Sequence, residues 1–379
     1  MALLERELDA DGLDRSLPPM DHGLMRRRKA AQGAANQVAQ LHESFFEDLT
    51  KEERAAPSAT AMKYALAVYG DGSRPLADAK QKDRSRFYIG LNVDPLEFVA
   101  ITKKAILVSD TLMLSQDSTG EYVKLGEYTE AHRIADGASY GVPITHHAEY
   151  GMRCTDLEGL GRWILDSEQL MKAGLLWFLP PYVRSTSSGT LGWTTQSSFR
   201  SPVDYLVKDR RAVDASGATP VKSKVIRPIL EMEIPYIDGV SLRDFSKITT
   251  NEFDSYSAFK NHLRQKLLEM DDAIENTQSA TRLAALEEEI KGGVAEVDAK
   301  MGVASRARWW ASSGATLCTV TVALTAVQDP KLLPLVAATG MSNQGIGNLY
   351  ERYRETRRKQ FRGEKWYYMW TIMKDGRPL

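Results

Sequence analysis

Cysteine is scarce in this chain, which has only Cys154 and Cys318 among 379 residues. The two lie far apart and form no CxxC pair, so a disulfide framework and a structural zinc site are both disfavoured, as in a reducing compartment. The opening MALLERELDADGLDRSLPP is acidic where a secretory signal needs a basic start and an apolar core. We therefore expect a cytoplasmic protein, or one peripheral to the inner face of the membrane.

The sequence also lacks the common cofactor-binding motifs. It has no excess of positive or of negative charge. It contains no Walker A motif, no dinucleotide-binding GxGxxG and no EF-hand loop, so we expect no cofactor. The net charge is -1, which gives no global attraction to nucleic acid or to an acidic ligand. Hydrophobic residues at 43% and charged residues at 26% indicate a globular chain, and its length allows two domains.

The N-terminal half alternates apolar runs with amphipathic segments. After an acidic tail over 1–24, apolar residues at steps of three and four predict a helix over 31–49. Short apolar runs predict strands at 85–93, 111–116 and 175–181. Helix starts are predicted at Asp94-Pro95 and at the capping box of Thr155 and Glu158, and a helix end at Gly174. This alternation predicts an α+β or α/β domain over 25–250.

Two further segments of this domain have less regular patterns. Residues 185–200 are rich in Ser, Thr and Gly, which predicts a long loop within a loop or linker over 185–218. Residues 224–237 have a β-like pattern that Pro228 and Pro235 interrupt, which is typical of an edge strand. Ser241 and Asp244 predict the start of a short helix.

Residues 251–379 predict a mainly α-helical domain. Apolar residues recur at steps of three and four in two stretches, 259–274 and 283–301. The polar link ENTQS between them favours an antiparallel, coiled-coil-like hairpin over one continuous helix. The basic run 351–362 then predicts an amphipathic helix, and WYYMWTI a terminal hydrophobic strand.

The order of these C-terminal segments resembles a pattern found in uncharacterised bacterial proteins. The pattern comprises AGLLWFLPP, IPYIDGVSLRDFSKI, a long helical stretch, an apolar segment and WYYMWTI. The resemblance covers the C-terminal half and rests on hydrophobic pattern. It implies an α/β N-terminal half and a helical C-terminal half with an apolar hairpin, and it implies no activity.

The segment from Gly137 to Glu149 holds the candidate catalytic residues. GASYG matches the G-x-S-x-G nucleophile elbow with Ser139 at its centre, but the preceding residues are polar and Pro143 stands where a helix should run. A Gly-rich turn is the simpler interpretation. His146, His147 and Glu149 are capable metal ligands or catalytic groups, although neighbours on a strand point to opposite faces. A polar loop beside the sheet is the alternative.

Glu231 and Glu233 are candidate ligands of a divalent metal ion. They stand two residues apart, on one face of the expected strand, and paired carboxylates on a sheet can hold such an ion. A solvated strand face is the simpler interpretation.

The C-terminus combines basic and aromatic residues in a way that allows contact with nucleic acid. Aromatic rings at Trp366 or Tyr367 could stack on bases, beside phosphate contacts. The basic residues are Arg352, Arg354, Arg357, Arg358, Lys359 and Arg362. The alternatives are a plain amphipathic helix, or the flank of a membrane segment.

Residues 309–350 predict an apolar hairpin. No charge occurs over 309–327, Trp309 and Trp310 stand at its start, and 332–350 is a second, weaker apolar stretch. Close packing of the two arms is favoured by Gly314, Gly340 and Gly345. Against a stable membrane span stand the hydroxyl residues Ser312, Ser313, Thr316, Thr319, Thr321 and Thr325. A hairpin packed within a soluble protein and a hairpin that inserts into a membrane both remain open.

These features favour a non-enzymatic regulatory or interaction protein with a conditional membrane contact through 309–350. The rivals are a hydrolase centred on Ser139 or on 146–149, and a nucleic-acid-binding module that uses 350–368. The expected partners are another protein, a membrane surface or a second copy of the chain, with nucleic acid ranked below them.

Overall fold

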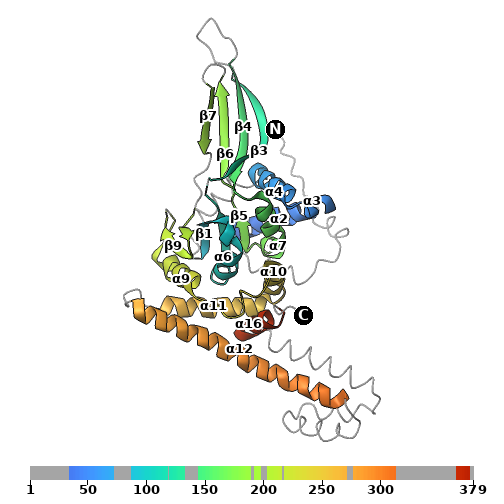
Figure 1. Cartoon of the computed structure of the whole chain (residues 1–379), viewed down its shortest axis with the longest axis vertical. Helices are drawn as coiled ribbons and strands as arrows, with labels where there is room; N and C mark the ends of the chain where they lie inside the picture. Colours follow the sequence, from blue (N-terminus) through green and yellow to red (C-terminus); the bar gives the residue numbers. More distant parts are fainter. Residues whose placement is uncertain are drawn as a thin grey trace, which may run out of the picture.

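The computed structural model describes residues 34–71, 87–117, 119–132, 144–188, 192–197, 203–215, 217–270, 276–312 and 364–375. Figure 1 shows three tiers along the longest axis of the molecule. An antiparallel sheet stands at one end, a sheet with its helices forms the middle, and long helices lie across the other end. The chain thus combines mixed sheets in its N-terminal half with helices in its C-terminal part, as in an α+β protein.

The central sheet has five strands in the order β5-β2-β1-β8-β9. They are β1 (Tyr88–Val93), β2 (Thr111–Ser115), β5 (Leu176–Phe178), β8 (Tyr205–Lys208) and β9 (Arg211–Asp214). The first four strands run parallel and β9 pairs antiparallel with β8. β2 and β5 are buried along their whole length, as near-continuous apolar strands in a covered parallel sheet should be. The strands predicted at 85–93, 111–116 and 175–181 are confirmed.

The β1–β2 connection begins as its sequence predicts. The Asp94 carboxylate accepts a hydrogen bond from the Leu96 N–H and starts the short 3-10 helix η1 (Pro95–Glu97), with Pro95 at its first position. Helix α6 (Phe98–Ala105) follows and buries Phe98 and Ile101. Pro95 suits this position because a helix leaves its first N–H groups without partners.

Five of the described helices pack against one another in the N-terminal half. They are α2 (Ala34–Glu47), α3 (Lys51–Ala55), α4 (Pro57–Asp71), α7 (Leu157–Asp166) and α8 (Glu168–Lys172). One of them, α8, contacts the edge strand β5. The helix predicted over 31–49 corresponds to α2. The Thr155 capping box is wrong, because Asp156 is the N-cap of α7 and accepts from the Gly159 N–H. Gly174 ends the segment with φ of 70°, as predicted.

A buried polar network ties these helices to the edge of the sheet. The His42 ring on α2 places Nδ1 3.3 Å from the Met171 carbonyl oxygen and Nε2 3.1 Å from the Tyr64 hydroxyl on α4. That hydroxyl lies 2.9 Å from the Phe178 carbonyl oxygen and 3.0 Å from its nitrogen, at the edge strand β5. The Tyr64 hydroxyl therefore provides hydrogen-bond partners for the Phe178 N–H and C=O of β5. Among the described residues, no further strand lies beside this edge.

His42 should make stability depend on pH. Burial is the main cause that lowers the pKa of His42 from 6.5 to about 4. The unfolded chain takes up this proton as the pH falls below about 6.5, and the folded chain does so only near pH 4. We therefore expect His42 to cost up to about 3 kcal/mol of stability across this window. Urea unfolding from pH 7.5 to 4.5 should show a smaller loss for His42→Gln than for the unaltered chain. Parallel losses in the two proteins would contradict the assignment.

The second sheet rises from the body as four antiparallel strands in the order β3-β4-β6-β7 (Figure 1). They are β3 (Glu121–His132), β4 (Ile144–Cys154), β6 (Tyr182–Ser188) and β7 (Gly192–Ser197). The long loop predicted over 185–200 is wrong, because β6 and β7 pair from Val183–Ser197 to Ser188–Gly192. Thr has a high strand propensity, so a Ser/Thr-rich stretch also suits a two-stranded ribbon.

The edge strand predicted over 224–237 is also wrong. Residues Pro220–Glu231 form helix α9, which starts at the N-cap Thr219 with Pro220 at its first position. Its buried residues Val225, Ile226, Ile229 and Leu230 recur at helical spacing. Turns follow over 232–240, where Lys103 of α6 donates from Nζ to the carbonyls of Ile237 (3.0 Å) and Val240 (3.1 Å).

Helix α10 (Leu242–Asn251) begins at Ser241, whose hydroxyl accepts from the Asp244 N–H as predicted. It leads into α11 (Phe253–Glu269), which contacts Phe87 and Asp110, the residues just before β1 and β2. Arg264 places its guanidinium 4.0 Å from the centre of the Phe87 ring and donates to the Val108 carbonyl at 2.7 Å. Lys260 and Arg264 both pair with Asp110, at 3.0 and 2.7 Å. The first C-terminal helix is thus fixed to the central sheet.

Candidate functional site

Three of the described helices lie at the end of the molecule opposite the antiparallel sheet, and we call them the helical arm. They are α11, α12 (Asn276–Ser312) and α16 (Lys365–Asp375). Both helical stretches of the predicted hairpin are present, and Phe259, Leu263 and Leu267 are buried on α11. On α12 the buried residues are Leu286, Ile290, Val294 and Val297.

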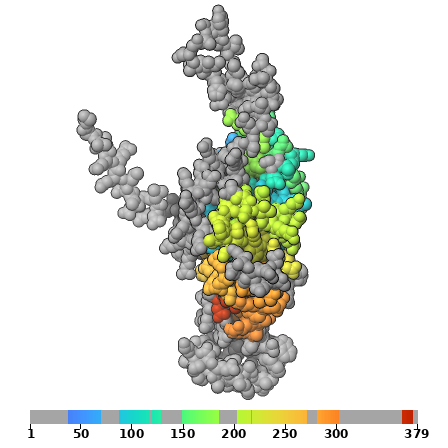
Figure 2. Space-filling model, turned by 90° about the vertical axis from the view of Figure 1, so that its left-hand side faces the viewer, coloured from blue at the N-terminus to red at the C-terminus, as the bar shows by residue number. Residues whose placement is uncertain are grey.

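The two helices of the hairpin are held together by a third helix, α16, whose sequence predicted a strand. Within the described residues, α11 and α12 approach α16 far more extensively than they approach each other. Figure 1 shows α16 lodged between them, and Figure 2 shows its red surface beside the orange surface of the two long helices. WYYMWTI is therefore helical, because it is enclosed on several sides at once. Its buried residues are Tyr367, Tyr368, Met369, Trp370 and Ile372.

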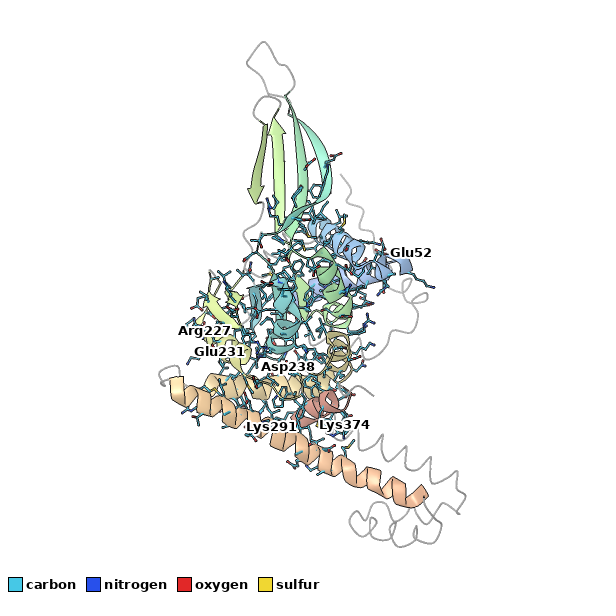
Figure 3. All side chains as sticks on the ribbon, in the orientation of Figure 1. Glu52, Arg227, Glu231, Asp238, Lys291 and Lys374 are labelled. Atoms are coloured by element: carbon cyan, nitrogen blue, oxygen red, sulfur yellow. The ribbon has the colours of Figure 1, made fainter. Side chains whose placement is uncertain are left out.

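Specific polar contacts fix the position of α16. The Tyr368 hydroxyl lies 2.8 Å from the Thr249 hydroxyl of α10, and both residues are buried. The Trp370 indole N–H donates to Asp298 of α12 at 2.9 Å. Lys374, at the end of α16, lies beside α12 (Figure 3), with Nζ 2.9 Å from the same carboxylate. α16 runs parallel to α12, because Trp366 lies at Gly293 and Trp370 at Asp298. It runs antiparallel to α11, because Trp366 contacts His262 and Tyr368 contacts Tyr256.

A cluster of titratable residues joins the three helices at the amino end of α16. His262 Nε2 on α11 lies 3.0 Å from Glu289 Oε1 on α12, and Lys365 Nζ lies 3.1 Å from His262 Nδ1. Lys266 Nζ is 3.8 Å from the other oxygen of Glu289. Burial, followed by the positive charge of Lys365, lowers the pKa of His262. A neutral His262 can accept from Lys365 and donate to Glu289 at the same time.

Two adjacent glycines on α12 offer a matched test of this packing. A Cβ at Gly293 would overlap the ring of Trp366, whereas one at Gly292 would meet nothing within 4 Å. We expect Gly293→Ala to destabilise the arm by about 1–3 kcal/mol through overpacking. Gly292→Ala should instead be neutral or stabilise by up to about 1 kcal/mol, because alanine favours a helix. Thermal unfolding followed by circular dichroism distinguishes the two variants. Equal melting temperatures would show that the Trp366 ring does not pack against Gly293.

The space between α11 and α12 continues beyond the amino end of α16 as an open groove of about 340 Å³. Met270, Ala285 and Leu286 provide its apolar surface. Its charged residues are Lys266, Glu269, Arg282 and Glu289. The groove carries both signs of charge, which gives no preference for an anion or a cation.

Helix α12 carries the start of the predicted apolar hairpin away from the body. It has 37 residues, so it is about 55 Å long. Its last part extends beyond the other described elements (Figure 1), and Trp309 and Trp310 lie in its final turns. The rest of the predicted hairpin, including Gly314, Gly340 and Gly345, lies outside the described residues, and so does the basic run 352–362. None of the described helices combines the length and apolar character that crossing a membrane requires.

The candidate catalytic residues lie in different settings. Ser139 falls outside the described residues. His146, His147 and Glu149 are on β4, so the polar loop expected there is wrong. The register pairs His147 with Thr129 and Ser187, and Glu149 with Glu127 and Ser185. Glu149 accepts from Lys124 Nζ at 2.9 Å, in a cross-strand ion pair that accounts for its charge.

The candidate metal ligands do not lie on a strand. Glu231 is the last residue of α9 and Glu233 follows in the next segment, so they share no strand face. Figure 3 shows Glu231 below Arg227 on this helix, with Asp238 further along the chain. Among the described residues, no three His, Cys, Asp or Glu side chains gather closely enough to hold a metal ion.

The position of α16 between α11 and α12 was not predicted from the sequence. One signal could have revealed it, since four consecutive large apolar residues at 367–370 exceed what a half-exposed strand displays. A segment that is apolar all round is buried from several directions, and a helix between two helices satisfies that need.

No family model matches this chain, and neither the curated proteins nor the solved structures include a match to it.

Proposed function

We propose that this is a non-enzymatic cytoplasmic regulatory or interaction protein that contacts a membrane through residues 309–350. One observation supports this most directly. Helix α12 runs out from the body and ends at Ser312, inside the charge-free stretch 309–327. An apolar sequence held at the end of a projecting helix can reach a membrane surface while the body stays in water.

The anchoring of α16 adds a second argument. Residues 313–364 leave from α12 and return to α16, and α16 packs on α12 around Gly293 and Asp298. Both ends of this segment are therefore held by the same arm. A membrane hairpin needs its two ends on one side of the bilayer, and basic residues flank 309–350 on both sides, as the positive-inside rule requires of such a hairpin.

The proposal is tested by co-sedimentation of the full-length protein with vesicles that contain anionic lipid. We expect the protein to bind and to stay bound at high salt, because apolar burial is insensitive to screening. The double variant Val320→Asp/Leu324→Asp should bind at least about 100-fold more weakly, since one central Asp costs about 2.5–3.5 kcal/mol in a membrane helix.

The matched control is Ala295→Asp/Ala299→Asp, which places the same charges at the same spacing on exposed positions of α12. This control should bind vesicles like the unaltered protein. A full-length chain that ignores anionic vesicles, or equal binding by the two double variants, would overturn the proposal.

The hydrolase and the nucleic-acid-binding module stay as alternative proposals. Among the described residues, no contact favours either of them. The first is centred on Ser139 or on the segment 146–149, and the second uses residues 350–368.

A further inference from the structure

The titratable cluster at the amino end of α16 places charges from three helices around His262, whose side chain is 14% exposed. Its Nε2 lies 3.0 Å from Glu289 Oε1 on α12. The Lys365 ammonium on α16 is close to both ring nitrogens, at 3.1 Å from Nδ1 and 3.2 Å from Nε2. Lys266, on the same helix as His262, also lies beside Glu289. These are the charged groups that act on the ring, so one carboxylate faces two ammonium groups even when His262 is neutral.

A proton on His262 would add a third cation to this cluster. The charged ring would be attracted by Glu289 and repelled by Lys365 at nearly the same distance, so the attraction and the repulsion almost cancel. Burial then decides the balance, because it disfavours a charged ring. The pKa of His262 is lowered accordingly, first by burial and then by the charge of Lys365. The packed position of α16 therefore favours a neutral His262.

The amino end of α16 is the part of the cluster that can move most readily. α11 is fixed to the central sheet through Asp110, whereas α16 has only 11 residues, and isolated helices of this length are marginal in water. The first turn of α16 contains no acidic side chain, and the exposed Glu364 precedes it. The partial positive charge of a helix amino end also opposes a cation nearby. The later residues Tyr368 and Trp370 are held separately, by Thr249 and Asp298.

We infer that His262 is a pH-sensitive switch in the helical arm: when its ring takes up a proton, the amino end of α16 separates from α11 and α12. Trp366 moves with Lys365, because its ring packs on His262 and at Gly293. The packing is complete above the ordinary pKa of histidine, about 6.5, and weakens as the pH falls below it. The inference concerns the arm itself and does not rest on membrane contact.

Hydrogen exchange of the full-length protein, measured by mass spectrometry at pH 7.5 and 5.5, tests this switch. The informative amides are those of 369–372, because in a helix they donate to the carbonyls of the first turn, 365–368. Each rate is divided by the intrinsic exchange rate at the same pH. We expect exchange in the unaltered protein to accelerate by up to about tenfold at pH 5.5, the limit for a histidine that has a pKa of about 6.5 when free and stays neutral when packed.

Two variants assign this acceleration to the cluster. His262→Gln should show nearly the same corrected rate at both pH values, because glutamine does not titrate. Lys365→Met should reduce the acceleration, since it removes the ammonium beside the ring. His42→Gln is the matched control and should keep the acceleration, because His42 contacts Tyr64 of α4 and Met171 of α8 instead of α16.

Unchanged protection of 369–372 in the unaltered protein, or an equal acceleration in His262→Gln, would overturn the inference. An acceleration that is lost in His42→Gln would also overturn it, because the titration would then belong to His42. Circular dichroism at pH 7.5 checks that each variant is folded. If His262→Gln does not fold, Lys365→Met decides, and an acceleration as large as in the unaltered protein would count against the switch.

Discussion

Replacing Lys222 with methionine is expected to lower the free energy of unfolding by about 3–5 kcal/mol. Asp204 precedes β8, and its side chain is only 1% exposed. Lys222 Nζ on α9 lies 2.8 Å from Asp204 Oδ1, and the Gly90 N–H of β1 donates to Asp204 Oδ2 at 2.6 Å. Removing the cation would leave a buried carboxylate with no compensating charge from Lys222, which is the costly way to disrupt a buried ion pair.

Urea unfolding at neutral pH measures this loss. Lys208→Met is the matched control, since Lys208 is an exposed lysine on β8 and should change stability by less than about 0.5 kcal/mol. The double variant Asp204→Asn/Lys222→Met should recover part of the stability, because it removes both charges. A Lys222→Met protein as stable as the Lys208→Met control would show that the pair contributes little.

Leu267→Asp should destabilise the protein by a similar amount, about 3–5 kcal/mol. Leu267 is fully buried on α11, next to the residues that face α12 and α16. An ionised side chain there would lose its hydration, and burying a charge without a partner is costly. We expect a lower melting temperature and weaker packing of α16 against α11.

Asn261→Asp provides the control, because it introduces the same side chain at an exposed position of the same helix. Its melting temperature should stay close to that of the unaltered protein. Were Leu267→Asp to melt together with Asn261→Asp, the assignment of the inner face of α11 would be wrong.

Local sequence signals located most of the central sheet. β1, β2 and β5 are short apolar runs between turn residues, and the Asp94 and Ser241 caps are readable because each acts within three residues. α9 was misread because Val225, Ile226, Ile229 and Leu230 also suit a strand, and because Pro228 argues against a helix. Thr219 followed by Pro220 was the helix-start signal that should have taken precedence.

The helical arm shows where local signals stop being sufficient. The steps of apolar residues on α11 and α12 predicted two helices, and both are present. The sequence could not show that α16, more than 50 residues further on, fills the space between them, because nothing local encodes that distance. The candidate residues on β4 illustrate the same limit, since only strand register places His147 opposite Ser187.

The pairing of β1 with β8 has a consequence for the newly made chain. The Gly90–Asp204 hydrogen bond joins residues that are 114 positions apart. At a synthesis rate of about 5–20 residues per second, β8 follows β1 out of the ribosome by about 6–23 s. During that interval one edge of β1 has no partner strand, although β1 is an apolar segment that would pair readily with other chains. The nascent protein is therefore prone to aggregation through this edge of β1 until β8 has been made.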